Sequence, residues 1–126
     1  MQKETEIKLR VSRETLAALR EHPSLKKRNK SGWSRHELLN QYFDTPARDR
    51  AQAKVALRIR RDGDDIIQTL KTRGHSVAGL SERNEYDWPL SKAKLDAKKL
   101  TADCWPASLA ELDKKQLQAI FSTDFV

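Results

Sequence analysis

The stretch Lys3-Glu4-Thr5-Glu6-Ile7-Lys8-Leu9-Arg10-Val11 alternates charged and uncharged side chains from Glu4 onward. Successive side chains of a β-strand point to opposite faces. In a strand over residues 2–11, Glu4, Glu6, Lys8 and Arg10 would therefore share one face. Two carboxylates followed in register by two cations could hold both a metal ion and an anion.

Composition limits the class of protein. The 126 residues are enough for one domain, residues 1–126, and 25 Lys and Arg against 18 Asp and Glu leave a net charge of +7, which favours anionic partners. No apolar run approaches the ~18 residues of a membrane span, and the N-terminus lacks a signal-peptide pattern. The single Cys104 excludes an intrachain disulfide and a multi-cysteine zinc site. A cytoplasmic enzyme or binding module is expected, without a membrane partner.

A β-hairpin is the clearest local prediction. Residues 55–60 and 66–71 are rich in β-branched and aliphatic side chains, and the segment between them contains Asp62-Gly63, a strong turn signal. Two further strands are predicted over about 35–44 and 80–88. These strands, with the first, predict an antiparallel sheet.

Helices are predicted on either side of these strands. Ser12 can cap a helix in which Leu16 and Leu19 form a buried stripe. After Pro89 the pattern becomes helical, and Asp113 with Gln116 resembles a capping box ahead of apolar residues at helical spacing. The expected fold class is therefore α+β, with helices packed outside the sheet.

The charged faces of the predicted strands repeat one pattern. Each strand has an apolar face that helices can cover, and the charged faces together supply six cations: Lys8, Arg10, Arg58, Arg60, Lys71 and Arg73. Arg83, Glu85 and Asp87 share a face of the 80–88 strand. If these faces met on the concave side of a sheet, like charges 4 Å apart would repel by roughly 4 kcal/mol at an effective dielectric near 20. A triphosphate would relieve this repulsion, because Arg and Lys bind phosphate oxygens and carboxylates share a divalent cation with them. The alternative is a solvated outer face with ion pairs worth less than ~1 kcal/mol each.

Five segments in order resemble the CYTH superfamily, the triphosphate tunnel metalloenzymes. They are Glu4-x-Glu6-x-Lys8, Tyr42-Phe43-Asp44-Thr45-Pro46, Leu57-Arg58-Ile59-Arg60, Leu70-Lys71-Thr72-Arg73 and Arg83-Asn84-Glu85-Tyr86. The resemblance implies an antiparallel sheet that curves into a tunnel with triphosphate inside, and Mg²⁺ or Mn²⁺ as the metal.

The resemblance also implies residue roles. Glu4 and Glu6 would bind the metal or orient the attacking water, and Glu85 would support the water or a cation. The phosphate ligands would be Lys8, Arg10, Arg58, Arg60, Lys71, Arg73 and Arg83. Family members have a second half with another Glu-x-Glu strand, which this sequence does not contain. We therefore expect an incomplete tunnel, a truncated domain, and weak or absent activity of this form.

Hydrolysis of inorganic triphosphate is the leading interpretation of these residues. The resemblance leaves open a thiamine triphosphatase, for which Trp33, Trp88 or Tyr42 would serve as an aromatic platform, or a class IV adenylate cyclase. A non-catalytic module that binds polyphosphate or RNA is the alternative of another class. Nucleic acid is disfavoured because the aromatic residues do not fall on the charged faces and Glu4 and Glu6 would repel phosphates.

An open sheet edge would also let two copies form a homodimer.

Overall fold

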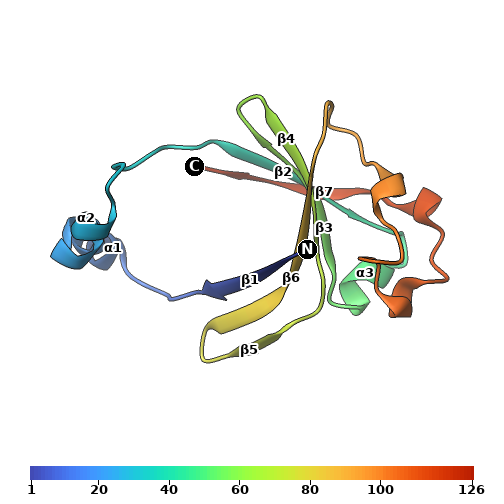
Figure 1. Cartoon of the computed structure of the whole chain (residues 1–126), viewed down its shortest axis with the longest axis horizontal. Helices are drawn as coiled ribbons and strands as arrows, with labels where there is room; N and C mark the ends of the chain where they lie inside the picture. The colour runs from blue at the N-terminus through green and yellow to red at the C-terminus, as the bar shows by residue number, and fades with distance from the viewer.

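The structure is a computed structural model that describes residues 1–126. Seven antiparallel strands form its framework (Figure 1): β1 (Gln2–Ile7), β2 (Leu38–Asp44), β3 (Ala56–Asp62), β4 (Asp65–Lys71), β5 (His75–Val77), β6 (Leu80–Pro89) and β7 (Gln118–Phe125). The helices are α1 (Arg13–Glu21), α2 (Pro23–Arg28) and α3 (Asp49–Gln52), with short 3₁₀ helices η1 (Ala97–Lys99), η2 (Ala107–Leu109) and η3 (Lys114–Gln116). None of the helices has the length and apolarity needed to cross a membrane.

The strands form one open sheet in the order β1-β6-β4-β3-β2-β7, and β5 also pairs with β6. The β3–β4 hairpin turns at Gly63, whose φ of +59° suits the first central position of a tight hairpin turn. Strands β1 and β7 each have one neighbour, so the sheet has two free edges and does not close. The predicted antiparallel, incomplete barrel is confirmed.

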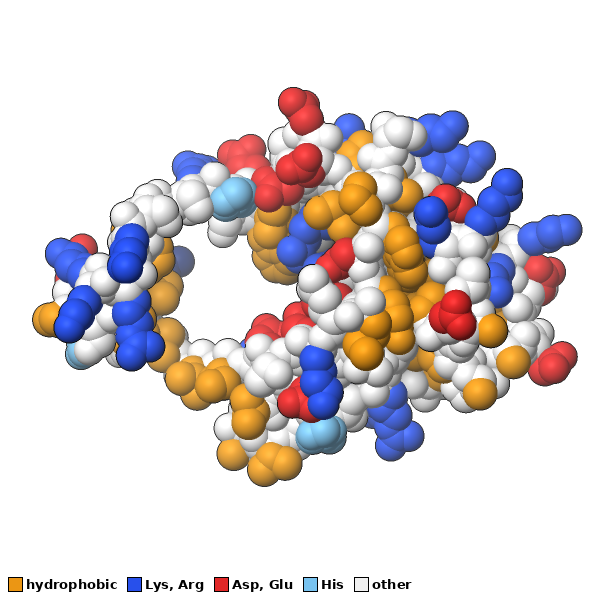
Figure 2. Space-filling model, viewed as in Figure 1, with side chains coloured by type: hydrophobic (Ala, Val, Ile, Leu, Met, Phe, Trp, Pro, Cys, Tyr) orange, Lys and Arg blue, Asp and Glu red, His pale blue; other side chains and the backbone are white.

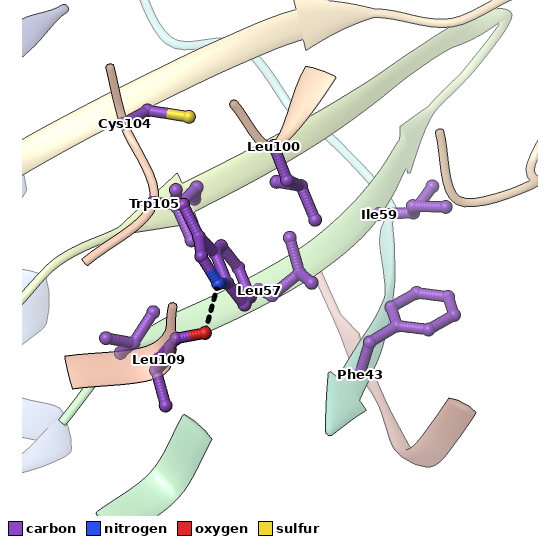
Figure 3. Packing of buried hydrophobic residues seen from close by; sticks show 9 residues of the cluster. Phe43, Leu57, Ile59, Leu100, Cys104, Trp105 and Leu109 are labelled. Atoms are coloured by element: carbon purple, nitrogen blue, oxygen red, sulfur yellow. Dashed lines mark hydrogen bonds between the residues drawn. The ribbon is translucent and has the colours of Figure 1, made fainter. Parts of the chain in front are cut away.

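The core lies on one face of the sheet. Leu57 and Ile59 of β3 and Leu70 of β4 are 0–1% exposed and pack under the irregular segment that follows β6. Figure 3 shows Leu100 and Trp105 from that segment against Leu57, with the indole Nε1 of Trp105 donating to the carbonyl of Leu109 at 2.9 Å. The apolar face expected from the alternation of each strand is therefore the face that the later chain covers. Its cover consists of 3₁₀ turns and loops.

Helices α1 and α2 lie apart from this core. They are joined to the sheet by two extended connections (Figure 1), and an opening separates them from it in the space-filling picture drawn from the same direction (Figure 2). Ser12 caps α1 as predicted, with its hydroxyl accepting the N–H of Thr15 at 3.1 Å. The predicted buried stripe is wrong: Leu16 is 54% exposed and Leu19 is 39% exposed, because the helix does not pack on the sheet.

The helix predicted at the C-terminal end is also wrong. Residues 118–125 form β7, which pairs with β2 from Asp44↔Gln118 to Leu38↔Phe125. Asp113 accepts the N–H of Lys115 at 3.0 Å and caps only the 3₁₀ turn η3. The helical spacing of Leu117, Ile120 and Phe121 suggested a helix, but the segment instead forms hydrogen bonds with β2 as a strand. The strand predicted from residue 2 to 11 likewise ends at Ile7.

Candidate functional site

The pairing register places the predicted charged residues on a single face of the sheet, opposite the core. Glu4 pairs with Arg83, Glu85 with Lys71, and Arg58 with Thr69, so these side chains share a face across β1, β6, β4 and β3. Figure 2 shows acidic and basic side chains on the wall of the opening. We call the face of Glu4, Arg58, Arg60, Lys71, Arg83 and Glu85 the charged face.

Glu4 forms the central ion pairs of the charged face. One carboxylate oxygen lies 2.6 Å from Lys71 Nζ and the other lies 3.4 Å from Arg83 Nε. The side chains of Glu4 and Lys71 are only 21% and 11% exposed. Burial raises the pKa of Glu4, but the hydrogen bond and charge of Lys71, with Arg83, outweigh it and hold the pKa below its usual value. Glu4 therefore stays ionised and neutralises part of the cationic charge.

Arg58 and Arg60 lie on β3 without an acidic partner. Arg58 Nε is buried and has no hydrogen-bond partner. Arg60 Nε donates to the Asn40 side-chain oxygen at 2.8 Å, and burial together with the charge of Arg58 lowers the pKa of Arg60. Two adjacent guanidinium groups without a carboxylate would favour a multivalent anion, since an orphaned buried donor is costly.

Glu85 has the opposite environment to Glu4. Burial and the charge of Asp87 raise the pKa of Glu85 above its usual value. Asp87 accepts the Thr69 hydroxyl at 2.6 Å, whereas Glu85 forms no ion pair within 4.0 Å. A carboxylate of raised pKa is a better base than a free one, and this is how enzymes separate acid and base roles.

The remaining predicted residues lie at one end of the charged face or outside it. Lys8 and Arg10 follow the end of β1, and both are exposed. Lys8 Nζ lies 3.8 Å from a carboxylate oxygen of Glu6, which is 36% exposed. Arg73 follows β4 and lines a pocket together with Lys8 and Arg83. Arg10 has no contact with the charged face through pairing or hydrogen bonding, because the strand has already ended.

The carboxylates do not make a metal centre by themselves. No group of three or more His, Cys, Asp or Glu side chains lies close enough to hold a metal ion. Both oxygens of Glu4 are engaged by Lys71 and Arg83, so Glu6 is the more available ligand. Mg²⁺ is usually held by one or two carboxylates plus phosphate oxygens of the substrate. Glu4 would be free to bind Mg²⁺ together with Glu6 only if phosphate oxygens replaced its carboxylate as the partner of Lys71 and Arg83.

Asp44, at the end of β2, holds the backbone that leads to the arginines of β3. Its carboxylate is fully buried, accepts the backbone N–H groups of Thr45, Arg50 and Ala51 at 2.8–3.1 Å, and lies 3.5 Å from Arg50 Nε. These bonds tie the end of β2 to α3, which leads into β3 and its arginines. In the segment 42–46, only Tyr42 had a predicted role, as an aromatic platform, and the buried Asp44 is structural.

An aromatic pair lies on the charged face, so the expectation that no aromatic residue falls there is wrong; Tyr42 was named as a possible platform, but Phe121 was not. Tyr42 pairs with both Arg58 and Phe121, and its ring stacks on that of Phe121 with centroids 4.7 Å apart. Phe121 is 49% exposed. Asn40 on the same strand was also missed, although it accepts from Arg60 and donates to the Thr123 hydroxyl at 3.2 Å. The alternation of β2 was a usable signal for Asn40 and Tyr42, but Phe121 required knowing that β7 is a strand.

The comparisons with known proteins agree with this geometry. The family model of the CYTH domain matches residues 2–126. An inorganic triphosphatase of Haemophilus influenzae is 36% identical over 86 residues, which are 68% of this chain and 24% of that protein.

Two solved structures are also similar. One is a proposed adenylyl cyclase from Hippeastrum with a dominant triphosphatase activity, at 29% identity and a TM-score of 0.53 over 69% of this chain and 40% of that one. The other is a proposed adenylate cyclase from Bacillus halodurans, at 26% identity and a TM-score of 0.52 over 95% of this chain and 60% of that one. The chain thus spans between about a quarter and three fifths of the length of these relatives.

Proposed function

The chain belongs to the CYTH domain family, and from this premise we propose that its charged face binds inorganic triphosphate and hydrolyses it with the help of Mg²⁺ or Mn²⁺. The observation that carries the proposal is the set of cations around Arg58, whose buried Nε has no partner. Residues 1–126 would act as one domain, as a hydrolase of the phosphoanhydride bond. The relative from Haemophilus influenzae is an inorganic triphosphatase, which supports this substrate.

The cations and the carboxylates of the charged face would have different roles. Arg58, Arg60, Lys71 and Arg83 would bind the phosphate oxygens, and Lys8, Arg10 and Arg73 would extend this set at the rim. Positioning and neutralisation of charge supply most of the catalysis in phosphoryl transfer. Glu85, whose pKa is raised, would orient the attacking water and accept its proton.

We expect a divalent metal to bind between the carboxylates of the charged face and the phosphate oxygens of the substrate. The resemblance to the triphosphate tunnel metalloenzymes implies such a metal. When a phosphate chain binds Lys71 and Arg83, Glu4 would be released to join Glu6 as a carboxylate ligand. The metal would neutralise negative charge on the phosphate oxygens.

The proposal is tested by comparing two arginines of one strand. Arg58 lies on the charged face, whereas Arg61 is exposed and belongs to the opposite face. Arg58→Met should weaken tripolyphosphate binding at least tenfold in calorimetric titration, and Arg61→Met should change it less than twofold. Tripolyphosphate should also raise the melting temperature more than orthophosphate, since a ligand at 100 times its Kd adds about 2.7 kcal/mol. Equal effects of the two variants, or of the two anions, would contradict the proposal.

A specific observation favours a thiamine triphosphatase or an adenylate cyclase as the second candidate. The stacked Tyr42 and Phe121 lie beside Arg58 and would provide a platform for a planar ring attached to a triphosphate. Phosphate release from tripolyphosphate, thiamine triphosphate and ATP, with Mg²⁺ or Mn²⁺, separates these activities. Loss of activity on the ring-bearing substrates alone in Phe121→Ala would favour the second candidate.

Binding without catalysis is the alternative of another class. A module for polyphosphate or RNA should keep its ligand in the presence of a chelator and release no phosphate. A cytoplasmic location and pairing of two copies through the free edges of β1 and β7 stay predictions. Light scattering tests the pairing, and a strictly monomeric species would contradict it.

A further inference from the structure

A pocket of about 370 Å³ continues the charged face beyond Arg83. It has no hydrophobic side chain among the ten residues that line it: Lys8, Lys54, Arg73, Gly74, His75, Ser76, Gly79, Ser81, Glu82 and Arg83. Four of these are cations and one is a carboxylate. Glu82 is already paired with Lys3 at 2.8 Å. The pocket therefore has an excess of positive charge.

A β-bulge forms this pocket. Lys71 pairs with Glu85 and His75 with Glu82, so three residues lie between the pairs on one strand and two on the other. The extra residue places Ser76, instead of His75, opposite Ser81 and so on the face of Arg83. A Cβ on Gly74 would lie 1.9 Å from the carbonyl oxygen of Glu82, so the bulge requires glycine. The pocket is thus a specific feature of this backbone.

Lys54 enters the pocket from the loop between α3 and β3. Its φ of +60° is the left-handed region, which is unfavourable for a lysine and occurs mostly where surrounding structure imposes it. It has no acidic partner within 4.0 Å, and neither has Arg73. A cation held in a strained conformation without a counter-charge is available for a ligand anion.

The cations extend beyond the first residue of β3. Lys54 precedes the strand and is six residues from Arg60, which is at most roughly 20 Å at ~3.3 Å per residue. Three phosphates joined by single oxygens fall well short of that length, so a triphosphate bound at Arg58, Lys71 and Arg83 would leave the Lys54 end of the pocket free for further phosphates.

We propose that the pocket is a subsite for additional phosphates of a linear inorganic polyphosphate, and that Lys54 is the residue that determines this preference for longer chains. The inference rests on the proposed binding of triphosphate to the charged face. Binding would place a terminal phosphate between Lys54 and Arg73, within reach of the Ser76 and Ser81 hydroxyls. Chains of three phosphates would not need Lys54.

The test compares two variants of Lys54 with a lysine from the exposed basic stretch of α2. Lys54→Met should weaken binding of a long-chain polyphosphate about tenfold, which corresponds to roughly 1.4 kcal/mol, and change tripolyphosphate binding less than twofold. Lys54→Gly should weaken the long chain equally while its melting temperature stays at or above that of the parent, because glycine accepts a positive φ. Lys27→Met should leave both affinities within twofold.

Two results would overturn the inference. An unchanged affinity of Lys54→Met for the long chain would show that the pocket is not used. An equal loss in Lys27→Met would show nonspecific attraction of a polyanion to a basic protein. If tripolyphosphate itself failed to bind the parent protein, or Arg58→Met left that binding unchanged, the proposed function would fail instead, so the two failures are distinguishable.

Discussion

Replacing Glu4 with Gln should lower stability and raise affinity for tripolyphosphate at the same time. Glu4 is the acidic centre of the charged face, 2.6 Å from Lys71 Nζ and 3.4 Å from Arg83 Nε. Gln keeps the size of the side chain but removes its charge. Lys71 would then lie beside Arg83 and Arg58 without its ion-pair partner.

The loss of stability in Glu4→Gln can be estimated from how deeply the Glu4 and Lys71 side chains are buried. Breaking a buried ion pair costs about 3–5 kcal/mol, and an exposed pair is worth about 0–1 kcal/mol. With 21% and 11% of the two side chains exposed, Glu4→Gln should destabilise the free protein by about 2 kcal/mol. A domain of this size should then melt about 8 °C lower.

The effect on binding has the opposite sign. In a chelator, Glu4 competes with the phosphate oxygens for Lys71 and Arg83 and repels them. Removing its charge should tighten tripolyphosphate binding about tenfold, or roughly 1.4 kcal/mol. With Mg²⁺ present, the same variant should lose phosphate release, because a carboxylate that the metal needs is absent.

The assay combines thermal melting with calorimetric titration of tripolyphosphate in EDTA. Glu14→Gln, on an exposed position of α1, is the matched control and should change neither quantity. Weaker tripolyphosphate binding by Glu4→Gln in EDTA, or an unchanged melting temperature, would refute the reasoning that Glu4 neutralises the phosphate-binding cations.

Three further predictions concern acidic groups. The stabilisation from Glu4, whose folded pKa lies below 4.5, should be complete above about pH 4.5 and disappear as the pH falls further; melting curves of the parent and Glu4→Gln should therefore converge in acid. Glu85 has a raised pKa, so its ionised form is unfavourable in the fold. Glu85→Gln should raise the melting temperature at pH 7 and abolish phosphate release, and a gain that persisted unchanged at pH 4 would contradict this explanation. Asp44→Ala should cost about 3–5 kcal/mol in urea unfolding because it leaves the buried Arg50 without its counter-ion, whereas the exposed Asp64→Ala should cost less than about 0.5 kcal/mol.

Local patterns were sufficient for the central part of the fold. The hairpin of β3 and β4 followed from two aliphatic segments around Asp62-Gly63, and β6 was predicted to within one residue. The same alternation identified which side chains face away from the core. It failed at β7, where apolar spacing suggested a helix, because a strand that pairs with β2 is stabilised by hydrogen bonds to residues almost eighty positions earlier.

The sequence by itself determined the two faces of each strand, since a period of two is a property of the extended backbone and needs no partner. Only the tertiary structure decided which strands are neighbours. The contact of Glu4 with Lys71 joins residues 67 positions apart, and the stack of Tyr42 on Phe121 depends on β7 pairing with β2. The bulge at Gly74 and the pocket that includes Lys54 also depend on register between strands. Such pairings are set by the balance of burial and hydrogen bonding over the whole sheet, which no local pattern contains.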